Sequence, residues 1–324
     1  MYTYSQLIEK TNDAVKHLSY PKTPEGLYEP MAYVLSLGGK RIRPVFLLLA
    51  AQIFGEKTES CMDAAVALEM FHNYTLLHDD LMDKADVRRG QPTVHRRWDD
   101  NTAILSGDAM LMLSCKKMYA AVKSVCPEAM EVFLKTTLEV SEGQQYDMNF
   151  ESRMDVSIPE YFEMIRLKTG VLVSCALEMG ALLGGASQED ARLLYDYGAQ
   201  IGRAFQVQDD YLDVFGDANV FGKRIGGDIL EGKKTFLLVT AFQKATATQK
   251  MQMMDWLEKK QFEPQEKIEF FTRMYEELEI PNDYEACMQD CYGKADALLE
   301  KLHGCTEAKQ ALKAFADTLS HRTK

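Results

Sequence analysis

Two short acidic clusters are the residues of this chain best suited to chemistry. One runs from Asp79 to Asp83 and the other from Asp209 to Asp213, and both follow the pattern Asp-Asp-x-x-Asp. On a helix, residues four apart share a face about 6 Å apart along the axis, whereas the middle aspartate is turned about 100° away. The first and third aspartates of each cluster are therefore expected to act as a pair.

Such clusters need positive charge beside them. Carboxylates at the C-terminal end of a helix repel one another and are disfavoured by the helix dipole. Apolar neighbours such as Leu76, Leu77 and Phe205 argue against a merely solvated helix end. Mg²⁺ prefers carboxylate oxygens and is usually held by one or two carboxylates together with substrate phosphates. Two facing clusters could therefore grip several Mg²⁺ ions and a diphosphate.

Basic residues accompany the acidic clusters. Lys40 and Arg43 stand at an expected helix start, where backbone N–H groups also favour anions. Other basic sites follow the first cluster, follow the second cluster or lie between the two: Arg88-Arg89, Lys223-Arg224, Lys233-Lys234 and Lys168. Acidic clusters with a basic rim suit two anionic substrates, one bound through metal and one bound directly by guanidinium and ammonium groups.

The elements that position these residues are predicted to be helices. Apolar residues recur at three- and four-residue spacing, for example over residues 64–71 and 193–212, and alternating β-branched stretches are absent. We predict an all-α fold of about a dozen helices with almost no strand. Two long charged connections, residues 84–97 and 216–231, are typical of functional loops, and the second is our candidate lid.

The composition predicts one globular domain over residues 1–324. Hydrophobic residues make up 46% and charged residues 27%, without a shift that divides the chain. The net charge of −12 argues against a nucleic-acid partner. No apolar run is long enough for stable membrane insertion, and the first residues do not resemble a secretory signal. Seven cysteines, an odd number, suggest reduced thiols, so we expect a cytoplasmic protein.

These motifs, in this order, resemble those of the all-trans isoprenyl diphosphate synthases, the short-chain branch of the polyprenyl synthetases. The resemblance spans nearly the whole chain and includes four further motifs: Gly143-Gln144-x-x-Asp147, Lys168-Thr169, Phe205-Gln206-x-Gln208 and Gly226-Gly227-Asp228-Ile229. It implies an orthogonal helix bundle around a deep central cavity, the type I isoprenoid synthase fold, in a homodimer. It also implies a Mg²⁺-dependent, head-to-tail condensation of isopentenyl diphosphate with an allylic diphosphate, which is dimethylallyl, geranyl or farnesyl diphosphate.

The resemblance also assigns a role to each site residue. Three Mg²⁺ ions would be bound by Asp79, Asp83 and Asp209, supported through bound waters or orientation by Asp80, Asp210 and Asp213. The allylic diphosphate would be contacted by Arg88, Lys168 and Lys223, with Asp147 orienting Arg88. Isopentenyl diphosphate would be held by Lys40, Arg43, His72 and Arg89. The allylic cation would be stabilised by Lys168, the Thr169 carbonyl and Gln206. The substrate-binding set is completed by Gln144 and Lys233.

Product length is expected to depend on residues that precede the first cluster. Tyr74 lies five residues before Asp79, about 7–8 Å along the helix, and Phe71 lies three further back. A bulky residue at the Tyr74 position acts in this family as the floor of the product pocket. The Tyr74-Thr75 pair is close to bacterial farnesyl synthases, whereas the first cluster, which has no insertion, resembles the geranylgeranyl type. Products of C15 and C20 therefore both stay open.

Other classes share part of the pattern. A terpene cyclase lacks the second Asp-Asp-x-x-Asp, so Asp213 together with Lys40 and Arg43 argues against it. Squalene- and phytoene-type synthases have a different aspartate spacing. A non-catalytic or modulating subunit of a heteromeric prenyl synthase usually loses one cluster, and here both are complete. A longer-chain polyprenyl diphosphate synthase is a further alternative.

Overall fold

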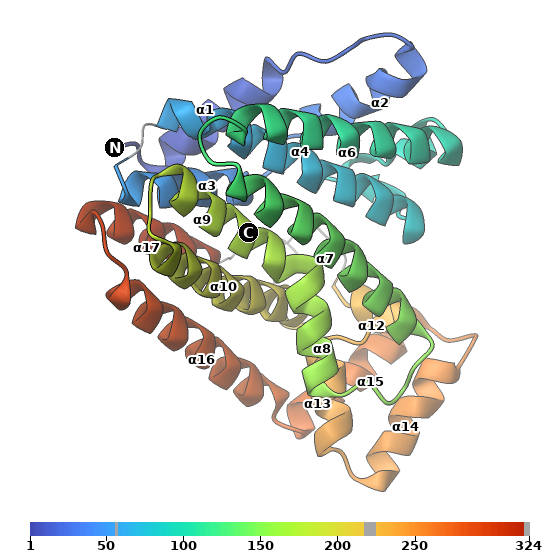
Figure 1. Cartoon of the computed structure of the whole chain (residues 1–324). Coiled ribbons are helices and arrows are strands. Elements are labelled where there is room, and N and C mark those ends of the chain that lie inside the picture. Colours follow the sequence, from blue (N-terminus) through green and yellow to red (C-terminus); the bar gives the residue numbers. More distant parts are fainter. Residues whose placement is uncertain (56–57, 217–224, 321–324) are drawn as a thin grey trace. The chain divides into compact units, whose positions relative to one another are not determined.

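The computed structural model describes residues 1–55, 58–216 and 225–320 and is almost entirely helical. These ranges contain sixteen α-helices, one π-helical turn and one short hairpin (Figure 1). The predicted all-α class is confirmed. The described helices outnumber the predicted dozen because elements as short as α5 (Val94–Arg97) and α12 (Gly227–Glu231) show no sequence period. None of the described helices combines the length and apolar character that a bilayer crossing requires.

The described chain forms two compact units, and each is described by itself. The first comprises Met1–Lys135, Cys175–Leu194 and His303–Lys313, and the second comprises Thr136–Ser174, Tyr195–Leu302 and the residues from 314 on. Four helices contribute residues to both units: α7 (Glu128–Glu151), α9 (Val171–Leu183), α10 (Gln188–Phe215) and α17 (Thr306–Ser320). The single domain expected over residues 1–324 stays a prediction.

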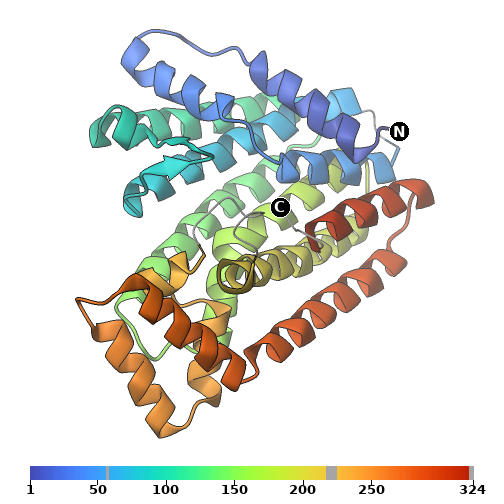
Figure 2. The ribbon, with the colours of Figure 1, turned by 180° about the vertical axis from the view of Figure 1, so that it is seen from behind.

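The first unit is built around a helix that is buried on all sides. The helices that lie wholly in this unit are α1 (Tyr4–Lys16), α2 (Glu25–Ser36), α3 (Ile42–Ile53), α4 (Thr58–Met82), α5 and α6 (Asp100–Val122). Helix α3 is buried from Pro44 to Ile53, as expected for a helix that is apolar all round. Helices α4 and α6 run side by side (Figures 1 and 2). Gly180 lets α9 approach closely, since a side chain there would collide with the Leu47 carbonyl.

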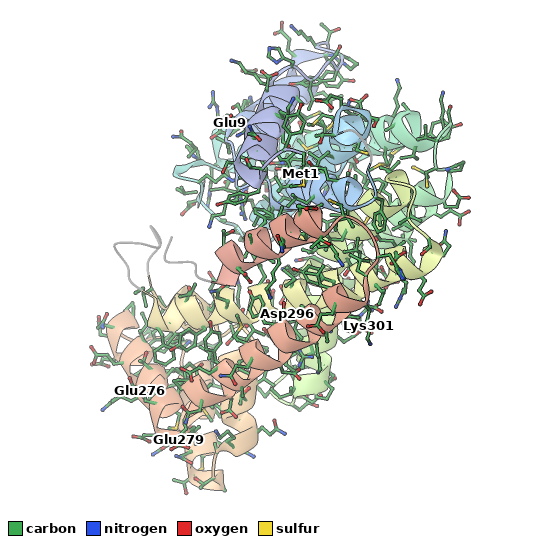
Figure 3. All side chains as sticks on the ribbon, turned by 90° about the vertical axis from the view of Figure 1, so that its left-hand side faces the viewer. Met1, Glu9, Glu276, Glu279, Asp296 and Lys301 are labelled. Carbon is green, nitrogen blue, oxygen red and sulfur yellow. The ribbon has the colours of Figure 1, made fainter. Side chains whose placement is uncertain are left out.

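The second unit contains most of α10 together with several shorter helices. These are α8 (Ile158–Ile165), the π-helical turn η1 (Arg166–Gly170), α12, α13 (Phe236–Lys244), α14 (Ala247–Glu258), α15 (Pro264–Glu277) and α16 (Ile280–Lys301). Tyr161, Phe236 and Tyr275 are buried together in its core. Charged side chains such as Glu276 and Lys301 lie exposed on the outside of this unit (Figure 3).

A hairpin that the sequence did not predict connects α4 to α5. Strand β1 (Val87–Arg88) pairs antiparallel with β2 (Gln91–Pro92). The two residues of the turn, Arg89 and Gly90, have φ values of 52° and 74°, which is the combination typical of a tight type I′ turn. Strands of two residues leave no alternating pattern to detect. The hairpin fixes the backbone positions of Arg88 and Arg89.

Candidate active site

Both acidic clusters lie at the C-terminal ends of long helices, as predicted. Helix α4 ends at Met82 and α10 ends at Phe215. The first and third aspartates of each cluster retain exposed surface. The middle ones do not: Asp80 is 5% exposed and Asp210 is 4% exposed. The helical spacing therefore sorts each cluster into a solvent-accessible pair and a single buried carboxylate.

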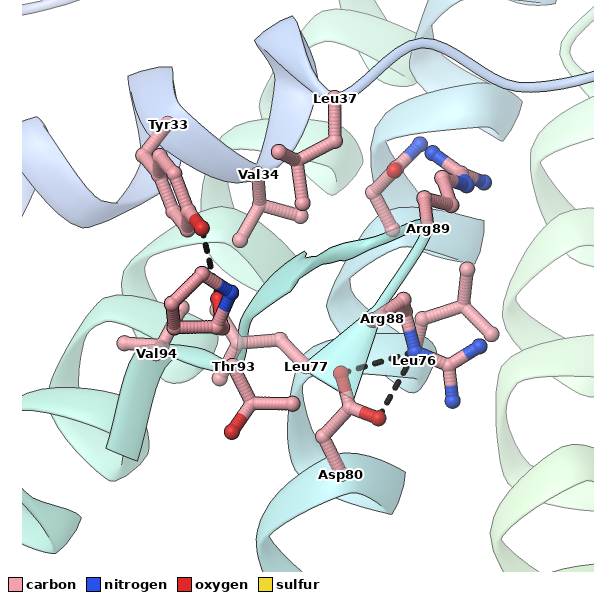
Figure 4. A pocket seen from close by; sticks show the side chains of 12 residues that line it. Tyr33, Val34, Leu37, Leu76, Leu77, Asp80, Arg88, Arg89, Thr93 and Val94 are labelled. Atoms are coloured by element: carbon pink, nitrogen blue, oxygen red, sulfur yellow. Dashed lines mark hydrogen bonds and ion pairs between the residues drawn. The ribbon is translucent and has the colours of Figure 1, made fainter. Parts of the chain in front are cut away.

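Asp80 is neutralised by an arginine from the hairpin. The Arg88 Nε donates to both carboxylate oxygens at 2.7 and 2.8 Å, as the dashed lines in Figure 4 show. Burial raises the pKa of Asp80, and the charge and hydrogen bond of Arg88 oppose that rise. The hairpin itself is held in place by the Tyr33 hydroxyl, which donates to the Pro92 carbonyl at 2.6 Å (Figure 4).

The second hairpin arginine lies against a glycine turn. The Arg89 guanidinium donates to the Gly38 carbonyl. A Cβ atom on Gly39, where φ is 144°, would lie 2.8 Å from the guanidinium of Arg89. Gly39 therefore leaves room for Arg89 beside the turn that carries Lys40, which is exposed at the start of α3.

Several arginine side chains surround His72. Arg43 donates to His72 Nε2 at 3.0 Å, so that nitrogen acts as an acceptor and the ring is neutral. Burial of the ring lowers the pKa of His72 well below its usual value, and nearby arginines, Arg43, Arg89, Arg88 and Arg41, lower it further. The predicted set of Lys40, Arg43, His72 and Arg89 thus includes three side chains that share one strongly positive region of the first unit.

Arg41 belongs to the glycine-lysine-arginine motif, but no role was predicted for it. Its backbone has φ of 51°, and its side chain is buried, with Nε donating to Asn12 at 2.9 Å. Its Nη1 donates to Glu69 Oε1 at 2.6 Å, and Asn73 donates to the same oxygen at 3.2 Å. This network fixes the turn between Gly39 and α3 to helices α1 and α4.

Asp210 is satisfied without any cation. Its Oδ2 accepts from the Tyr161 hydroxyl at 2.6 Å and from the Phe236 backbone N–H at 2.8 Å. Its Oδ1 accepts from Gln206 Nε2 at 3.0 Å. Burial raises the pKa of Asp210 to about 6, and these three hydrogen bonds oppose the rise. The Phe236 N–H opens helix α13, where a negative charge is favoured by the helix dipole.

Asp228 lies beside the second cluster. Its backbone N–H donates to Asp213 Oδ2 at 3.0 Å, and the Gly226 N–H donates to the Asp213 carbonyl at 2.6 Å. Burial, together with the charges of Asp213 and Asp210, raises the pKa of Asp228 to about 7. Lys233 Nζ lies 3.7 Å from Asp228 Oδ1. The turn after α12 therefore places the predicted substrate residue Lys233 close to the acidic end of α10.

Lys168 and Thr169 belong to a π-helical turn, a local geometry that is frequent at functional sites. The turn is packed so closely that a side chain on Gly143 would collide with the Lys168 backbone. A Cβ on Gly202 would lie 2.6 Å from Gly170 Cα. Thr169 Oγ1 donates to Gln206 Oε1 at 3.0 Å. Gln206, one of the predicted cation-stabilising groups, is therefore in direct contact with the side chain of Thr169, whose backbone carbonyl is another.

Asp147 and Arg88 each have a partner within their own unit. Asp147 Oδ2 accepts from Lys168 Nζ at 2.7 Å, and Arg88 binds Asp80. Asp147 lies one helical turn after Gly143, where α7 meets Lys168. The role of Asp147 in orienting Arg88 stays a prediction. Gln144 Oε1 is buried and has no hydrogen-bond partner among the described residues. Lys223 and most of the candidate lid, residues 217–224, lie outside the described residues.

Tyr74 lies in a stack of rings. Its ring centroid is 5.6 Å from that of Phe71 and 4.8 Å from that of His78, and Phe71 packs edge-on against Phe133 at 5.6 Å. Burial raises the pKa of Tyr74, as does the charge of Asp108 on α6. Thr75 Oγ1 donates to the His72 carbonyl at 2.8 Å. The predicted floor residue Tyr74 thus packs against Phe71, which in turn packs against Phe133, and both phenylalanines are fully buried.

The donor atoms fit Mg²⁺ bound together with a substrate. Among the described residues, no three side chains of His, Cys, Asp or Glu meet closely enough to hold a metal on their own. The solvent-accessible aspartate pairs offer hard oxygen ligands two at a time, and Mg²⁺ usually completes its octahedron with waters and substrate phosphates.

Comparison with known proteins decides the family. The family model of the polyprenyl synthetases matches residues 24–275, which is well over half of the chain. The chain belongs to the polyprenyl synthetase family. The family recognised from the sequence motifs is thereby confirmed.

Similar polyprenyl synthetases are known as proteins and as solved structures. A geranylgeranyl diphosphate synthase of Methanosarcina mazei is 44% identical over 237 residues, which cover 71% of this chain and 72% of that protein. A short chain isoprenyl diphosphate synthase of Methanothermobacter thermautotrophicus is 39% identical over 242 residues, covering 74% of each. A crystal structure of a geranylgeranyl pyrophosphate synthase superposes with a TM-score of 0.94 at 42% identity, covering 100% of both chains. The predicted isoprenoid synthase fold is confirmed.

Proposed function

We propose that this polyprenyl synthetase makes geranylgeranyl diphosphate, the C20 all-trans product. The predicted reaction class, head-to-tail prenyl diphosphate synthesis, is confirmed by membership of the family. The activity is supported by one observation above all. Helix α4 carries both the Asp79–Asp83 pair and, two turns earlier, His72, which is surrounded by arginines. The C20 length is supported by the first cluster, which has no insertion, and by relatives named geranylgeranyl diphosphate synthase.

Isopentenyl diphosphate is assigned to the basic region of the first unit. Arg43 and Arg89 supply guanidinium groups that match phosphate oxygens bidentately, and exposed Lys40 adds a mobile ammonium. His72 stays neutral there, so it positions Arg43 without adding charge. The buried Arg41–Glu69 pair has no net charge and fixes the turn that carries Lys40.

The allylic diphosphate is assigned to both aspartate pairs and to the basic residues near them. Asp79, Asp83 and Asp209 would hold Mg²⁺, and Asp213 would support them. Bound Mg²⁺ supplies neutralisation of the negative charge that develops on the departing diphosphate. Lys168, placed by its 2.7 Å bond to Asp147, and Lys233 near Asp228 add positive charge from the protein.

The carbon chemistry follows from ionisation of the allylic diphosphate. The C–O bond of the allylic group breaks, and the bonding electrons leave with the diphosphate. The isopentenyl double bond attacks the allylic cation, which forms the new C–C bond, and a proton is lost to the released diphosphate. Thr169 and Gln206 offer oxygen atoms that stabilise the cation.

We also propose that the enzyme is a homodimer. Helix α6 exposes an apolar stripe at seven-residue spacing, in which Leu105 is 60%, Met112 is 66% and Tyr119 is 56% exposed. Large exposed apolar side chains on one helix face mark an interaction surface. Light scattering should give twice the chain mass of 36.8 kDa. A mass of one chain at micromolar concentration would contradict the dimer.

The function is tested by incubating the chain with dimethylallyl diphosphate, isopentenyl diphosphate and Mg²⁺. The dephosphorylated products are then separated by chromatography. A C20 alcohol is expected with each allylic starter up to farnesyl diphosphate. A C15 end product would support the proposed reaction but contradict the C20 product length. No product from folded protein would favour a partner-subunit role.

Removing the floor side chain should lengthen the product. Tyr74→Ala leaves space beside Phe71, whose own ring is buried against Phe133. We expect products longer than those of the wild type, limited by Phe71, and still longer products when Phe71→Ala is added. Thr75→Ser is the control, because it keeps the hydroxyl that donates to the His72 carbonyl of the preceding turn. An unchanged length in Tyr74→Ala would show that Tyr74 is ordinary core.

A further inference from the structure

Four groups of the second unit form one continuous hydrogen-bonded relay around a buried carboxylate. Thr169 Oγ1 donates to Gln206 Oε1 at 3.0 Å, and Gln206 Nε2 donates to Asp210 Oδ1 at 3.0 Å. Tyr161 and the Phe236 backbone N–H donate to Asp210 Oδ2 at 2.6 and 2.8 Å. Tyr161 is only 1% exposed. Neither its burial nor its bond to Asp210 is required by the metal-binding role of the cluster.

The relay has one direction. The Phe236 N–H can only donate, and a carboxylate can only accept, so the Gln206 amide must turn its NH₂ group toward Asp210. Its carbonyl oxygen is then turned toward Thr169, whose hydroxyl must donate to it. Every hydrogen bond of the relay is thus donated in the direction of Asp210. The oxygen lone pairs of Thr169 and Gln206, both partly exposed, are left on the other side.

We propose that Tyr161, acting through Asp210, is a positioning residue that makes Gln206 and Thr169 present oxygen atoms to the allylic cation. The inference rests on the proposed function and deepens it. A flipped Gln206 would present N–H hydrogens, which repel a developing positive charge instead of stabilising it. Asp210 prevents the flip, and Tyr161 with Phe236 N–H satisfies Asp210 in the core.

The identity of the residue at 161 matters because it carries no formal charge. An arginine or lysine could also satisfy a buried carboxylate, but it would add positive charge behind the atoms that stabilise the cation. The tyrosine hydroxyl and the helix N-terminus satisfy the same carboxylate and leave its negative charge in place. That charge adds to the stabilisation of the cation through the aligned Gln206 and Thr169 dipoles.

The test is a double-mutant cycle on the full-length enzyme with Tyr161→Phe and Gln206→Leu. Tyr161→Phe should lower kcat about tenfold and leave both KM values unchanged, because a hydrogen bond to a charged group is lost away from the substrates. If Tyr161 acts through Gln206, the double variant is no slower than Gln206→Leu alone. Multiplying effects, or an unchanged kcat in Tyr161→Phe, would overturn the inference.

Controls separate the relay from packing and from the function itself. Tyr275→Phe makes the same chemical change in the same buried cluster, at a hydroxyl with no hydrogen bond among the described residues, and should keep kcat. If Tyr161→Phe unfolds in a thermal melt, Gln206→Asn replaces it: the shorter amide cannot bridge Asp210 and Thr169, so kcat should fall, and an unchanged kcat overturns the inference. Wild-type protein that makes no prenyl diphosphate would instead refute the proposed function.

Discussion

The two acidic clusters differ in the groups that bind their buried middle carboxylate. Each has a buried middle carboxylate, but Asp80 is neutralised by the guanidinium of Arg88, whereas Asp210 keeps its charge and is hydrogen-bonded by three uncharged donors. In the first unit, the basic residues near the cluster are proposed to bind anionic diphosphates. In the second, the buried carboxylate is linked to Gln206 and Thr169, which are assigned to a cation. We therefore propose that the partners of each buried middle carboxylate match what its neighbours bind: a cationic arginine beside the diphosphate, and uncharged donors behind the oxygen atoms that face the allylic cation.

The largest expected effect comes from placing a positive charge at Gln206, beside the proposed position of the allylic cation. Gln206→Lys puts an ammonium at the position of the carbonyl oxygen bonded to Thr169. We expect kcat to fall about a thousandfold, because the electrostatic stabilisation of the cation becomes repulsion. The measurement is single-turnover product formation with saturating substrates.

The neutral variant Gln206→Leu is its control. It removes the carbonyl without adding charge and should cost about tenfold to hundredfold in kcat. If Gln206→Lys and Gln206→Leu were equally slow, the sign of the charge at this position would be irrelevant, and the comparison of the two clusters would lose its chemical meaning.

A second prediction concerns stability in the first cluster. Arg88→Leu leaves Asp80 buried without its cation and should lower the free energy of unfolding by about 3 kcal/mol. The double variant Asp80→Leu/Arg88→Leu should recover most of that loss, because no unpaired charge remains. Denaturant titration measures both. A double variant as unstable as Arg88→Leu alone would show that Arg88 stabilises through packing.

The third prediction is a pH dependence with a defined sign. The pKa of Asp210 is raised by burial to about 6 in the folded chain, above the value near 4 of an unfolded one. Its contribution to stability is therefore fully present below pH 4 and is lost as the pH rises through 6. Between pH 4 and 7.5 this group alone lowers the free energy of unfolding by about 2 to 3 kcal/mol.

Denaturant titrations in a chelator at several pH values test this dependence. Asp210→Asn should flatten the curve, and Asp80→Asn should flatten it less, because Arg88 offsets part of the burial penalty. Asp228, whose pKa burial raises to about 7, contributes with the same sign in all variants. Identical slopes for the wild type and Asp210→Asn would contradict the assignment.

The sequence was sufficient for what depends on spacing along one helix. The separation of four residues correctly predicted that each cluster has an accessible pair and a middle aspartate on another face. It also placed both clusters at helix ends. A glycine inside a predicted helix, such as Gly143, was a readable signal of close packing, and the structure shows Lys168 as its neighbour.

Partners that come from distant segments were not readable. Tyr161 lies 49 residues from Asp210 and looks like any aromatic residue on an apolar helix face. The Lys168 partner of Asp147 was equally unreadable, because sequence order does not say which cation faces a carboxylate. The hairpin was missed because its strands have two residues each. The chemistry was local in sequence, whereas its positioning depends on tertiary packing.

The central proposal is that the accessible aspartates of each cluster bind the allylic diphosphate through Mg²⁺. Calorimetric titration with an unreactive allylic thiolodiphosphate, with and without Mg²⁺, tests it on the wild type, Asp79→Asn and Asp209→Asn. We predict Mg²⁺-dependent binding by the wild type and a loss of about a hundredfold in affinity in each variant. Wild-type affinity in either variant would contradict the claim.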